Sequence, residues 1–136
     1  MEVKFTILGE PTGKERPRFR RVGNYVQTYT PAKTKNYESH VINSYSADRY
    51  FQGPVRAEII AYYKIPDSAS KKAKQAMMDG TEKCLKKPDC DNLAKCILDA
   101  LNNVAYDDDK QVVELYVEKH WSDDPRVEVT LVELTK

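Results

Sequence analysis

The sequence is poor in the side chains that build disulfide frameworks and zinc sites. Its 136 residues include only three cysteines and two histidines. Cys84, Cys90 and Cys96 form no CxxC pair and are odd in number, which argues against a secreted disulfide scaffold. Neither His40 nor His120 lies near them in the chain, so a zinc site is disfavoured. We expect three free thiols.

Long apolar runs are also missing. No stretch approaches the roughly 20 residues that a membrane helix needs. The N-terminal segment MEVKFTILGE has no basic region followed by a long apolar stretch. We therefore expect no membrane association and a cytoplasmic location. A chain of 136 residues with 40% hydrophobic side chains has the size of one domain, so residues 1–136 are predicted to form a single domain.

The two parts of the chain differ in charge, although the formal net charge is only +1. Residues 1–88 carry 17 Lys and Arg against 9 Asp and Glu, a balance of +8. Residues 89–136 carry 5 against 12, a balance of −7. Phosphates attract cations and divalent metals attract carboxylates, so this division suits a protein that holds both DNA and metal ions. Many unrelated proteins share it, so the division alone identifies no function.

Hydrophobic periodicity predicts an α+β domain with a mixed β-sheet packed against helices. Period-two alternation and β-branched residues indicate strands, whereas apolar residues at helical spacing indicate helices. The expected order is a strand over 3–7, a basic loop and hairpin over 13–27, a helix over 34–50, a strand over 55–65, helices over 71–78 and 91–103, and strands over 111–121 and 126–134.

The basic segment over 13–27 is a candidate DNA-binding element, because its cations can follow phosphates without reading bases. The DNA-binding candidates are Lys14, Arg16, Arg18, Arg20 and Arg21. Second-rank candidates are Lys33, Lys35, Lys71, Lys72 and Lys74. Phe19 and Tyr25 could enter distorted DNA as apolar wedges, but we expect both to pack in the core. A solvated basic surface is the alternative reading.

Residues 87–113, KPDCDNLAKCILDALNNVAYDDDKQVV, contain the most specific pattern of the chain. On a helix, its apolar side chains gather on one face. These are Leu93, Cys96, Ile97, Ala100 and Leu101. Asp91, Lys95 and Asp99 line up on the opposite side, with Leu98 as the one apolar residue among them. Alone, such a stripe is most often a solvated face with weak ion pairs.

Further carboxylates flank this helix. Asp89 and Asp91 stand at its expected N-terminus, and the run Asp107–Asp109 follows its end after a short turn. If the chain folds back, these carboxylates form the oxygen-rich site that Mg²⁺ prefers, with positions left for water and a phosphate oxygen. Such a site supports phosphodiester hydrolysis. Lys95 could then neutralise charge on the scissile phosphate or position the water.

Other readings of these carboxylates lead to different expectations. Asp89 or Asp91 can serve as the helix N-cap, and three consecutive aspartates also suit a polar turn. The spacing of a calcium-binding EF-hand loop is absent, as are a P-loop and, with two histidines, a plausible Ser/His/Asp arrangement. Metal-assisted hydrolysis therefore fits the segment best.

The pattern D-x-D-N-L-x-K, then D-A-L-N, then D-D-x-Q-V resembles the RusA family of Holliday-junction resolvases, which are small homodimeric endonucleases of bacteria and prophages. The motif covers residues 87–113, and the element order of the whole chain is compatible with the family. Asp99 belongs to the pattern, either as a metal ligand or as a structural partner of Lys95. Asn92 is expected to shape the start of the helix.

The resemblance implies a role for each matching residue. Asp89 and Asp91 are expected to be metal-binding catalytic carboxylates, and Lys95 the catalytic lysine. The third carboxylate is Asp109, two residues before the Gln-Val pair. Asp108 is the alternative, because the triple aspartate blurs the register.

The resemblance also implies an activity. We expect a crossover junction endodeoxyribonuclease that cuts four-way DNA junctions with two symmetric nicks in recombination and repair, in the cytoplasm of a bacterium or phage-infected cell. The implied cofactor is Mg²⁺, with Mn²⁺ as a substitute, and the implied assembly is a homodimer. The alternatives are a related metal nuclease of flaps, forks or other branched DNA, and a non-catalytic DNA-binding protein whose acidic cluster is only a turn.

Overall fold

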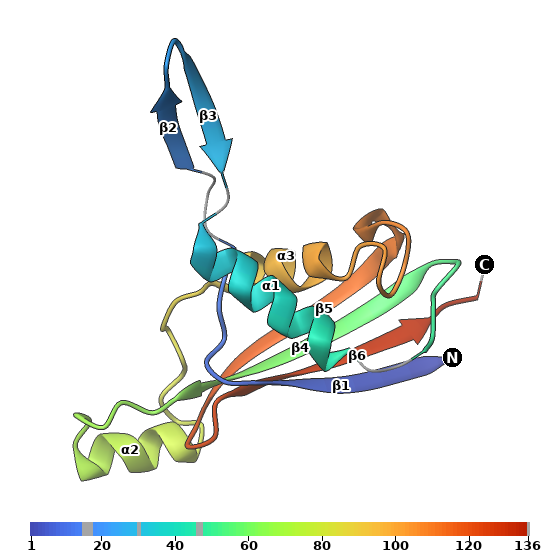
Figure 1. The fold of residues 1–136 in the computed structure, drawn as a ribbon. Coiled ribbons are helices and arrows are strands. Elements are labelled where there is room, and N and C mark those ends of the chain that lie inside the picture. The colour runs from blue at the N-terminus through green and yellow to red at the C-terminus, as the bar shows by residue number, and fades with distance from the viewer. Residues whose placement is uncertain (15–17, 30, 46–47, 136) are drawn as a thin grey trace.

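A computed structural model of the chain describes residues 1–14, 18–29, 31–45 and 48–135. Its main element is a four-stranded sheet (Figure 1). The strands are β1 (Glu2–Leu8), β4 (Val55–Lys64), β5 (Val112–Ser122) and β6 (Arg126–Glu133), in the spatial order β1-β6-β4-β5. β4 and β5 run parallel, whereas β6 is antiparallel to both β1 and β4. The predicted α+β class with a mixed sheet is confirmed.

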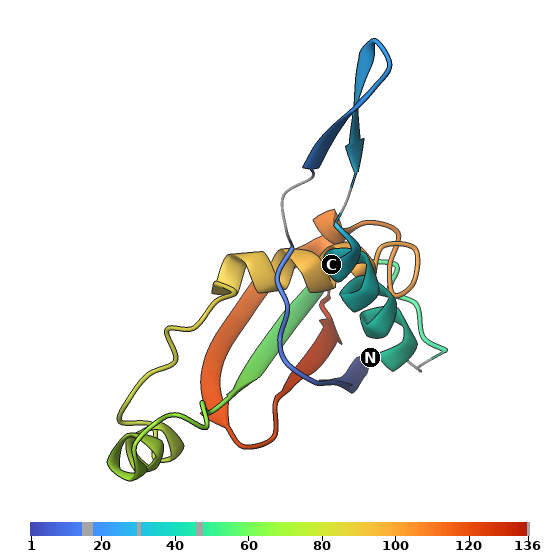
Figure 2. The same ribbon diagram turned by 60° about the vertical axis from the view of Figure 1, so that its left-hand side comes forward.

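Parallel strands need a crossover, and the chain between β4 and β5 contains two helices, α2 (Lys71–Met78) and α3 (Cys90–Ala100). α3 lies over one face of the sheet beside α1 (Ala32–Ser44), whereas α2 lies near one end of the sheet (Figures 1 and 2). With 13 residues, α1 is the longest described helix, so none of the described helices is long and apolar enough to cross a membrane.

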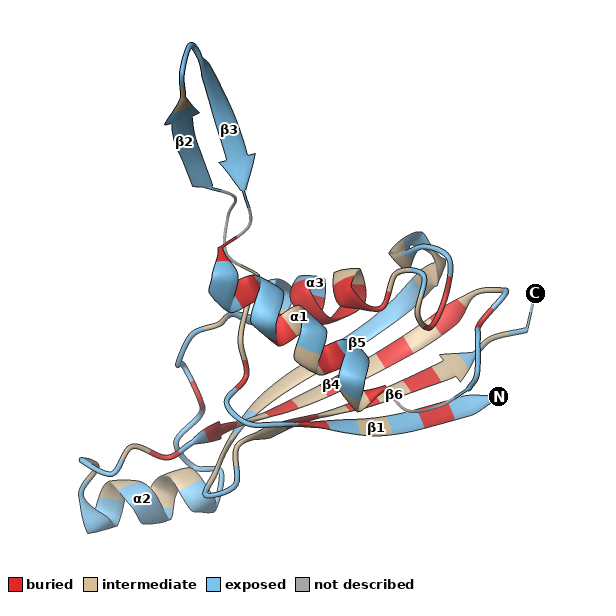
Figure 3. Ribbon diagram, in the orientation of Figure 1, coloured by how far each residue is buried: buried red, intermediate tan, exposed pale blue. Residues whose placement is uncertain are grey.

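The core lies between the sheet and the pair α1 and α3. Burial alternates along β4, so that one side of the strand faces the helices and the other is partly open (Figure 3). The buried side consists of Val55, Ala57, Ile59, Ala61 and Tyr63. This period-two pattern is the one that the sequence predicted for a strand. The packing fixes α3 against the sheet and leaves its other face for polar side chains.

A second, two-stranded sheet stands away from this body (Figures 1 and 2). It consists of β2 (Arg18–Val22) and β3 (Tyr25–Tyr29), and residues 18–29 are called the basic hairpin below. Gly23 in its turn has a φ of 61°, a left-handed backbone that glycine adopts without steric cost. Apart from the partly exposed Val22, all residues of the two strands are exposed.

The prediction that Phe19 and Tyr25 pack in the core is wrong. Their exposed fractions are 71% and 64%. Among the described residues the two strands of the hairpin pair only with each other, and the exposure of both rings shows that no other element packs over them. Apolar content within a hairpin indicates a strand pair, but it does not say whether the rest of the protein covers it.

α1 is shorter than predicted, ending at Ser44 instead of near Tyr50. Tyr45 leaves the helical backbone with a ψ of 89°, and its buried ring packs edge-on against Phe5 with ring centroids 5.3 Å apart. Its hydroxyl donates a hydrogen bond to the carbonyl oxygen of Arg49 at 2.7 Å. The aromatic residue that continued the helical pattern thus belongs to the core beyond the helix.

The three cysteines are free thiols, as expected. Cys84 and Cys96 are buried, and burial raises the pKa of Cys96 to about 12. Cys96 is therefore a small core side chain without thiolate character at neutral pH.

Candidate active site

α3 carries the predicted polar stripe on the side away from the core. All five residues predicted for its apolar face are buried. Asp91 and Lys95 are exposed, and Asp99 is half-buried. The helix begins at Cys90, one residue earlier than predicted, with Asp89 as its N-cap. Packing of the apolar face therefore sets the direction in which the polar stripe points.

The N-terminus of α3 borders a lysine-rich cleft. The carboxylate of Asp89 accepts no capping hydrogen bond from the helix and is exposed. The cleft beside it has a volume of about 450 Å³. Its four lysines are Lys14, Lys33, Lys86 and Lys87. The four lysines outnumber the two carboxylates of the cleft, Glu10 and Asp89, which suits a ligand that carries phosphates.

Gly13 brings the segment before the basic hairpin close to this end of α3. A Cβ atom on Gly13 would lie 2.6 Å from Cβ of Pro88 and 3.2 Å from Nδ2 of Asn92. The backbone N–H of Lys14 donates to the carbonyl oxygen of Asn92 at 3.4 Å. The close approach requires glycine, and it directs Lys14 towards the polar face of α3.

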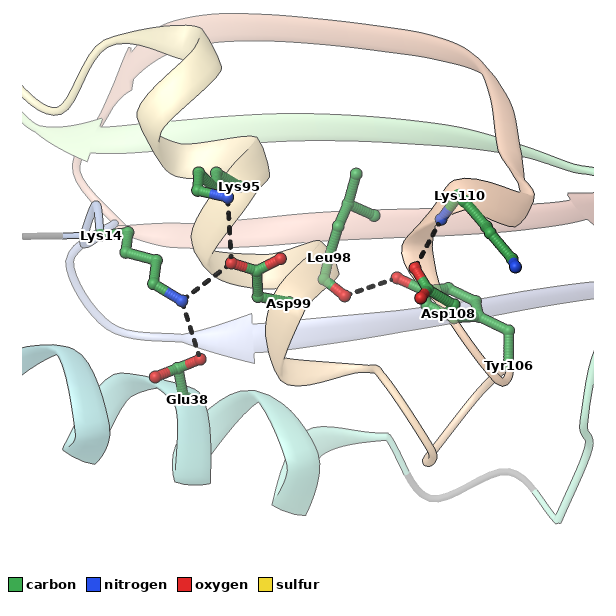
Figure 4. A network of polar contacts seen from close by, with 8 residues as sticks. All are labelled: Lys14, Glu38, Lys95, Leu98, Asp99, Tyr106, Asp108 and Lys110. Carbon is green, nitrogen blue, oxygen red and sulfur yellow. Dashed lines mark hydrogen bonds and ion pairs between the residues drawn. The ribbon is translucent and has the colours of Figure 1, made fainter. Parts of the chain in front are cut away.

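Lys14 and Lys95 contact the carboxylate of Asp99, and Glu38 lies on the other side of the Lys14 ammonium group (Figure 4). Nζ of Lys14 donates to Oδ2 of Asp99 at 2.8 Å and lies 3.9 Å from Oε2 of Glu38. Nζ of Lys95 lies 3.4 Å from the same oxygen of Asp99, as the helical spacing predicted. Burial by itself would raise the pKa of Asp99, but hydrogen bonds from Lys14 and Asp109 and the charges of both lysines hold it below its ordinary value.

The chain turns back after α3 and returns the acidic run to the helix. α3 ends at Ala100, earlier than the predicted Asn103, because Asn103 adopts a positive φ of 63° in the turn that follows. Tyr106 is buried, and its hydroxyl donates to the carbonyl oxygen of Leu98 at 2.7 Å (Figure 4). Leu98, the apolar member of the polar stripe, is itself buried. The acidic run begins directly after Tyr106.

Gln111 holds the acidic run in place. Its Oε1 accepts hydrogen bonds from the backbone N–H groups of Asp107 at 2.9 Å and Asp108 at 3.3 Å. Its Nε2 donates to the carbonyl oxygens of Phe51 at 2.9 Å and Gly53 at 3.0 Å. One side-chain amide thereby ties the acidic run to the segment that leads into β4.

Asp109 is the member of the run that reaches Asp99. Its carboxyl group lies within hydrogen-bonding reach of both Asp99 and Asp108. Burial, these two hydrogen bonds and the neighbouring negative charges raise the pKa of Asp109 to about 6. The hydrogen bond that Asp108 accepts from the backbone N–H of Lys110 lowers the pKa of Asp108 instead. Crowded carboxylates supply the oxygen ligands of a hard divalent cation, which would relieve their repulsion.

The predicted metal ligands lie in two groups, one at each end of α3. Asp109 and Asp108 lie with Asp99 near the C-terminal end, whereas Asp89 and Asp91 lie at the N-terminal end. Asp91 and Asp99 are separated by about 12 Å of helix rise. In the part of the chain that the structure describes, no three Asp, Glu, His or Cys side chains are grouped closely enough to hold one ion.

The predicted DNA-binding residues are divided between the basic hairpin and the site. Arg18, Arg20 and Arg21 belong to β2 and are exposed. The guanidinium of Arg20 lies 5.4 Å from the ring centroid of Tyr29. Lys14 is engaged with Asp99 at the edge of the site. Arg16, the remaining prediction, lies outside the described residues.

Sequence reasoning missed three features of this site. Gln111 was used to set the register of the motif, but no contact was predicted for its side chain. Lys86 and Lys87 lie just before Asp89, and this position was the signal that could have placed them beside it. The contact between Lys14 and Asp99 had no such signal, since 85 residues separate the two.

Comparisons with known proteins agree with the motif. Residues 9–132 match the family described as "Endodeoxyribonuclease RusA". The chain is also 38% identical over 138 residues to "Uncharacterized protein YqaN" of Bacillus subtilis (strain 168), an alignment that covers 98% of this chain and 97% of the relative. With nearly the whole chain matched and the motif residues placed on one helix and the loop that follows it, this protein belongs to the RusA family of endodeoxyribonucleases.

Proposed function

We propose that this chain is a Mg²⁺-dependent endonuclease that resolves four-way (Holliday) DNA junctions by paired symmetric nicks. Family membership supports cleavage of DNA. The observation that carries the proposal is the polar face of α3, where Asp91, Lys95 and Asp99 are joined by Asp109 and bordered by the lysine-lined cleft at Asp89. Carboxylates, a lysine and a basic cleft are the parts that metal-assisted phosphodiester hydrolysis requires.

Asp89, Asp91 and Asp109 are the proposed ligands of the metal ion, with Asp108 as the alternative to Asp109. When bound, Mg²⁺ or Mn²⁺ would polarise the phosphodiester and lower the pKa of a coordinated water. Asp89 and Asp91 stand at the other end of α3 from Asp109, so one ion held by all three requires these carboxylates to be drawn together.

Lys95 is the proposed catalytic lysine. Its side chain is 64% exposed and contacts Asp99, so its ammonium group can turn towards a phosphate. Lys14 holds the same carboxylate at 2.8 Å and keeps its charge compensated when Lys95 turns away. Lys95 would then stabilise negative charge that develops on the phosphate in the transition state.

The DNA backbone is proposed to follow the lysine-lined cleft beside Asp89 towards the basic hairpin. The cleft places cations next to Asp89, so a phosphate bound there would lie beside one of the proposed metal ligands. Arg18, Arg20 and Arg21 extend the positive charge away from the body. Contacts of this kind position DNA without reading its sequence.

Paired nicks on opposing strands need two active sites. A single chain has one α3 and one acidic run, so we propose a homodimer whose two-fold axis matches the approximate two-fold symmetry of the junction.

The test is cleavage of a labelled synthetic four-way junction by the wild-type protein and by Asp91→Asn, with Mg²⁺ or with a chelator. Asp123→Asn, in the exposed turn between β5 and β6, is the matched control. We expect cleavage by the wild type and the control only with Mg²⁺, and junction binding without cleavage by Asp91→Asn. Cleavage of flaps or forks but not of junctions would identify those structures as the substrate and leave the metal-dependent chemistry in place. If neither the wild type nor the variants cleave any DNA although they bind it, a non-catalytic DNA-binding protein is favoured; unchanged cleavage by Asp91→Asn would remove Asp91 from the active site.

A further inference from the structure

The basic hairpin exposes apolar and aromatic side chains on both of its faces. Residues paired across two antiparallel strands share a face. Phe19 pairs with Thr28, and Val22 pairs with Tyr25, so Phe19 and Tyr25 point to opposite faces of the hairpin. Phe19 is 71% exposed and Tyr25 is 64% exposed. No single surface of the body could cover both rings.

An isolated two-stranded hairpin is at best marginally stable in water, and rings as exposed as these add little to its own folding. Residues 18–29 contain three arginines and no aspartate or glutamate. Its surroundings are also basic, because Lys14 and Lys33 lie in the cleft near its base. The natural partner of such a surface is polyanionic and offers flat apolar faces.

Of these two requirements, duplex DNA meets only the one for negative charge. Its phosphates suit Arg20 and Arg21, but the ring of Phe19 has no polar atom and cannot form a hydrogen bond with a phosphate or a base edge. The faces of unpaired bases do suit aromatic rings, and base-aromatic stacking stabilises single-stranded complexes substantially. Apolar side chains that enter base steps act in the same way when a duplex is distorted.

We propose that the basic hairpin enters the centre of branched DNA, where Phe19 and Tyr25 stack on unpaired or unstacked bases while the arginines contact the surrounding phosphates. This inference rests on the proposed function for its substrate. It assigns selectivity for branched over duplex DNA to two exposed rings outside the group of carboxylates. Cleavage and recognition of the branch point are then carried by different parts of the chain.

The test uses binding without metal, so that it does not depend on cleavage. A four-way junction carries 2-aminopurine at the branch point or, as a reference, in the middle of one duplex. Wild type, Phe19→Ala, Tyr25→Ala and Phe19→Leu are compared with Tyr116→Ala, which removes an aromatic side chain of β5 that is 55% exposed. Thermal unfolding is measured for every variant, and the exposure of the two rings predicts wild-type values.

We expect the wild type to change the fluorescence of the branch-point probe and not that of the reference probe. Phe19→Ala and Tyr25→Ala should each weaken junction binding by roughly tenfold, leave duplex binding unchanged and reduce the branch-point signal. Phe19→Leu should behave like Phe19→Ala, because leucine keeps apolar area but cannot stack as an aromatic ring. Tyr116→Ala should behave like the wild type.

Equal losses on junction and duplex, or full rescue by Phe19→Leu, would overturn the inference. Persistence of the branch-point signal in both alanine variants would do the same. If the wild type gives the predicted binding pattern but does not cleave with Mg²⁺, the nuclease proposal fails and the inference about the hairpin stands. If junctions are cleaved while the alanine variants bind them as the wild type does, the nuclease proposal stands and the inference about the hairpin fails.

Discussion

Nζ of Lys14 donates a hydrogen bond of 2.8 Å to Oδ2 of Asp99, although 85 residues separate the two in the chain. Lys14 precedes the basic hairpin, and Asp99 contacts Asp109 at the proposed site. Glu38 of α1 lies 3.9 Å from the same ammonium group. The ion pair thus connects the base of the proposed DNA-binding element with the carboxylates of α3.

Lys14→Gln should lower the free energy of unfolding at pH 7 by about 1–3 kcal/mol, because it removes a charged hydrogen bond from a half-buried carboxylate. The folded-state pKa of Asp99 is depressed, so the stability it contributes is present above its ordinary pKa and is lost as pH falls through the folded value. The difference from wild type should therefore shrink at acidic pH. Urea unfolding at pH 7 and at pH values below 3.8, the ordinary pKa of an aspartate, measures it. Lys33→Gln, in the same cleft, is the control, and equal losses in both variants would contradict the assignment.

Gln111→Ala should destabilise the chain by about 2–3 kcal/mol, since four hydrogen bonds to backbone groups are lost. Gln111→Glu keeps an acceptor for the backbone N–H groups of Asp107 and Asp108 but turns a carboxylate towards two carbonyl oxygens. It should therefore also destabilise the folded chain. If Gln111 positions the acidic run, both variants need more Mg²⁺ for half-maximal cleavage at a temperature where they remain folded. Gln75→Ala, on the exposed side of α2, should leave stability and Mg²⁺ dependence unchanged. Loss of stability with an unaltered Mg²⁺ requirement would reduce Gln111 to a structural role.

Asp109→Asn should stabilise the metal-free protein at neutral pH, by on the order of 1 kcal/mol after allowance for solvent screening. The pKa of Asp109 is raised to about 6 in the folded protein, so its ionised form opposes folding above that pH. As pH falls below 6 the wild-type carboxyl gains a proton, and the advantage of the variant should disappear towards pH 4. Chemical unfolding in the presence of a chelator at several pH values gives the difference. A variant less stable than wild type at pH 8 would favour a structural role for this carboxylate.

Replacement of Arg18, Arg20 and Arg21 by alanine should weaken junction binding and flatten its dependence on salt. If each arginine contacts one phosphate, the slope of log K against log salt should fall by roughly 2–3. The matched control replaces Lys71, Lys72 and Lys74 of α2, another set of three cations. Binding titrations between low and moderate salt give both slopes. If the slope decreases more in the α2 variant than in the hairpin variant, the DNA runs along α2 and not along the hairpin.

Regular elements of this chain were predictable because their signals are local. The alternation along β4 and the apolar face of α3 follow directly from residue periods, and both are confirmed. The free-standing hairpin was not predictable, since exposure of Phe19 depends on the absence of a covering element. The contacts of Lys14 with Asp99 and of Gln111 with Phe51 join distant segments. These contacts arise from the way α3 crosses the sheet, which no spacing in the sequence encodes.

Junction resolution by this chain is best examined by mapping the nicks that the wild-type protein makes in a four-way junction. Each strand is labelled in turn, and the products made with Mg²⁺ are resolved to single nucleotides under denaturing conditions. We expect nicks at symmetric positions near the branch point in two opposing strands, and none in a duplex of the same sequence. Nicks at unrelated positions, in a single strand only, or equally in the duplex would contradict junction resolution by this chain.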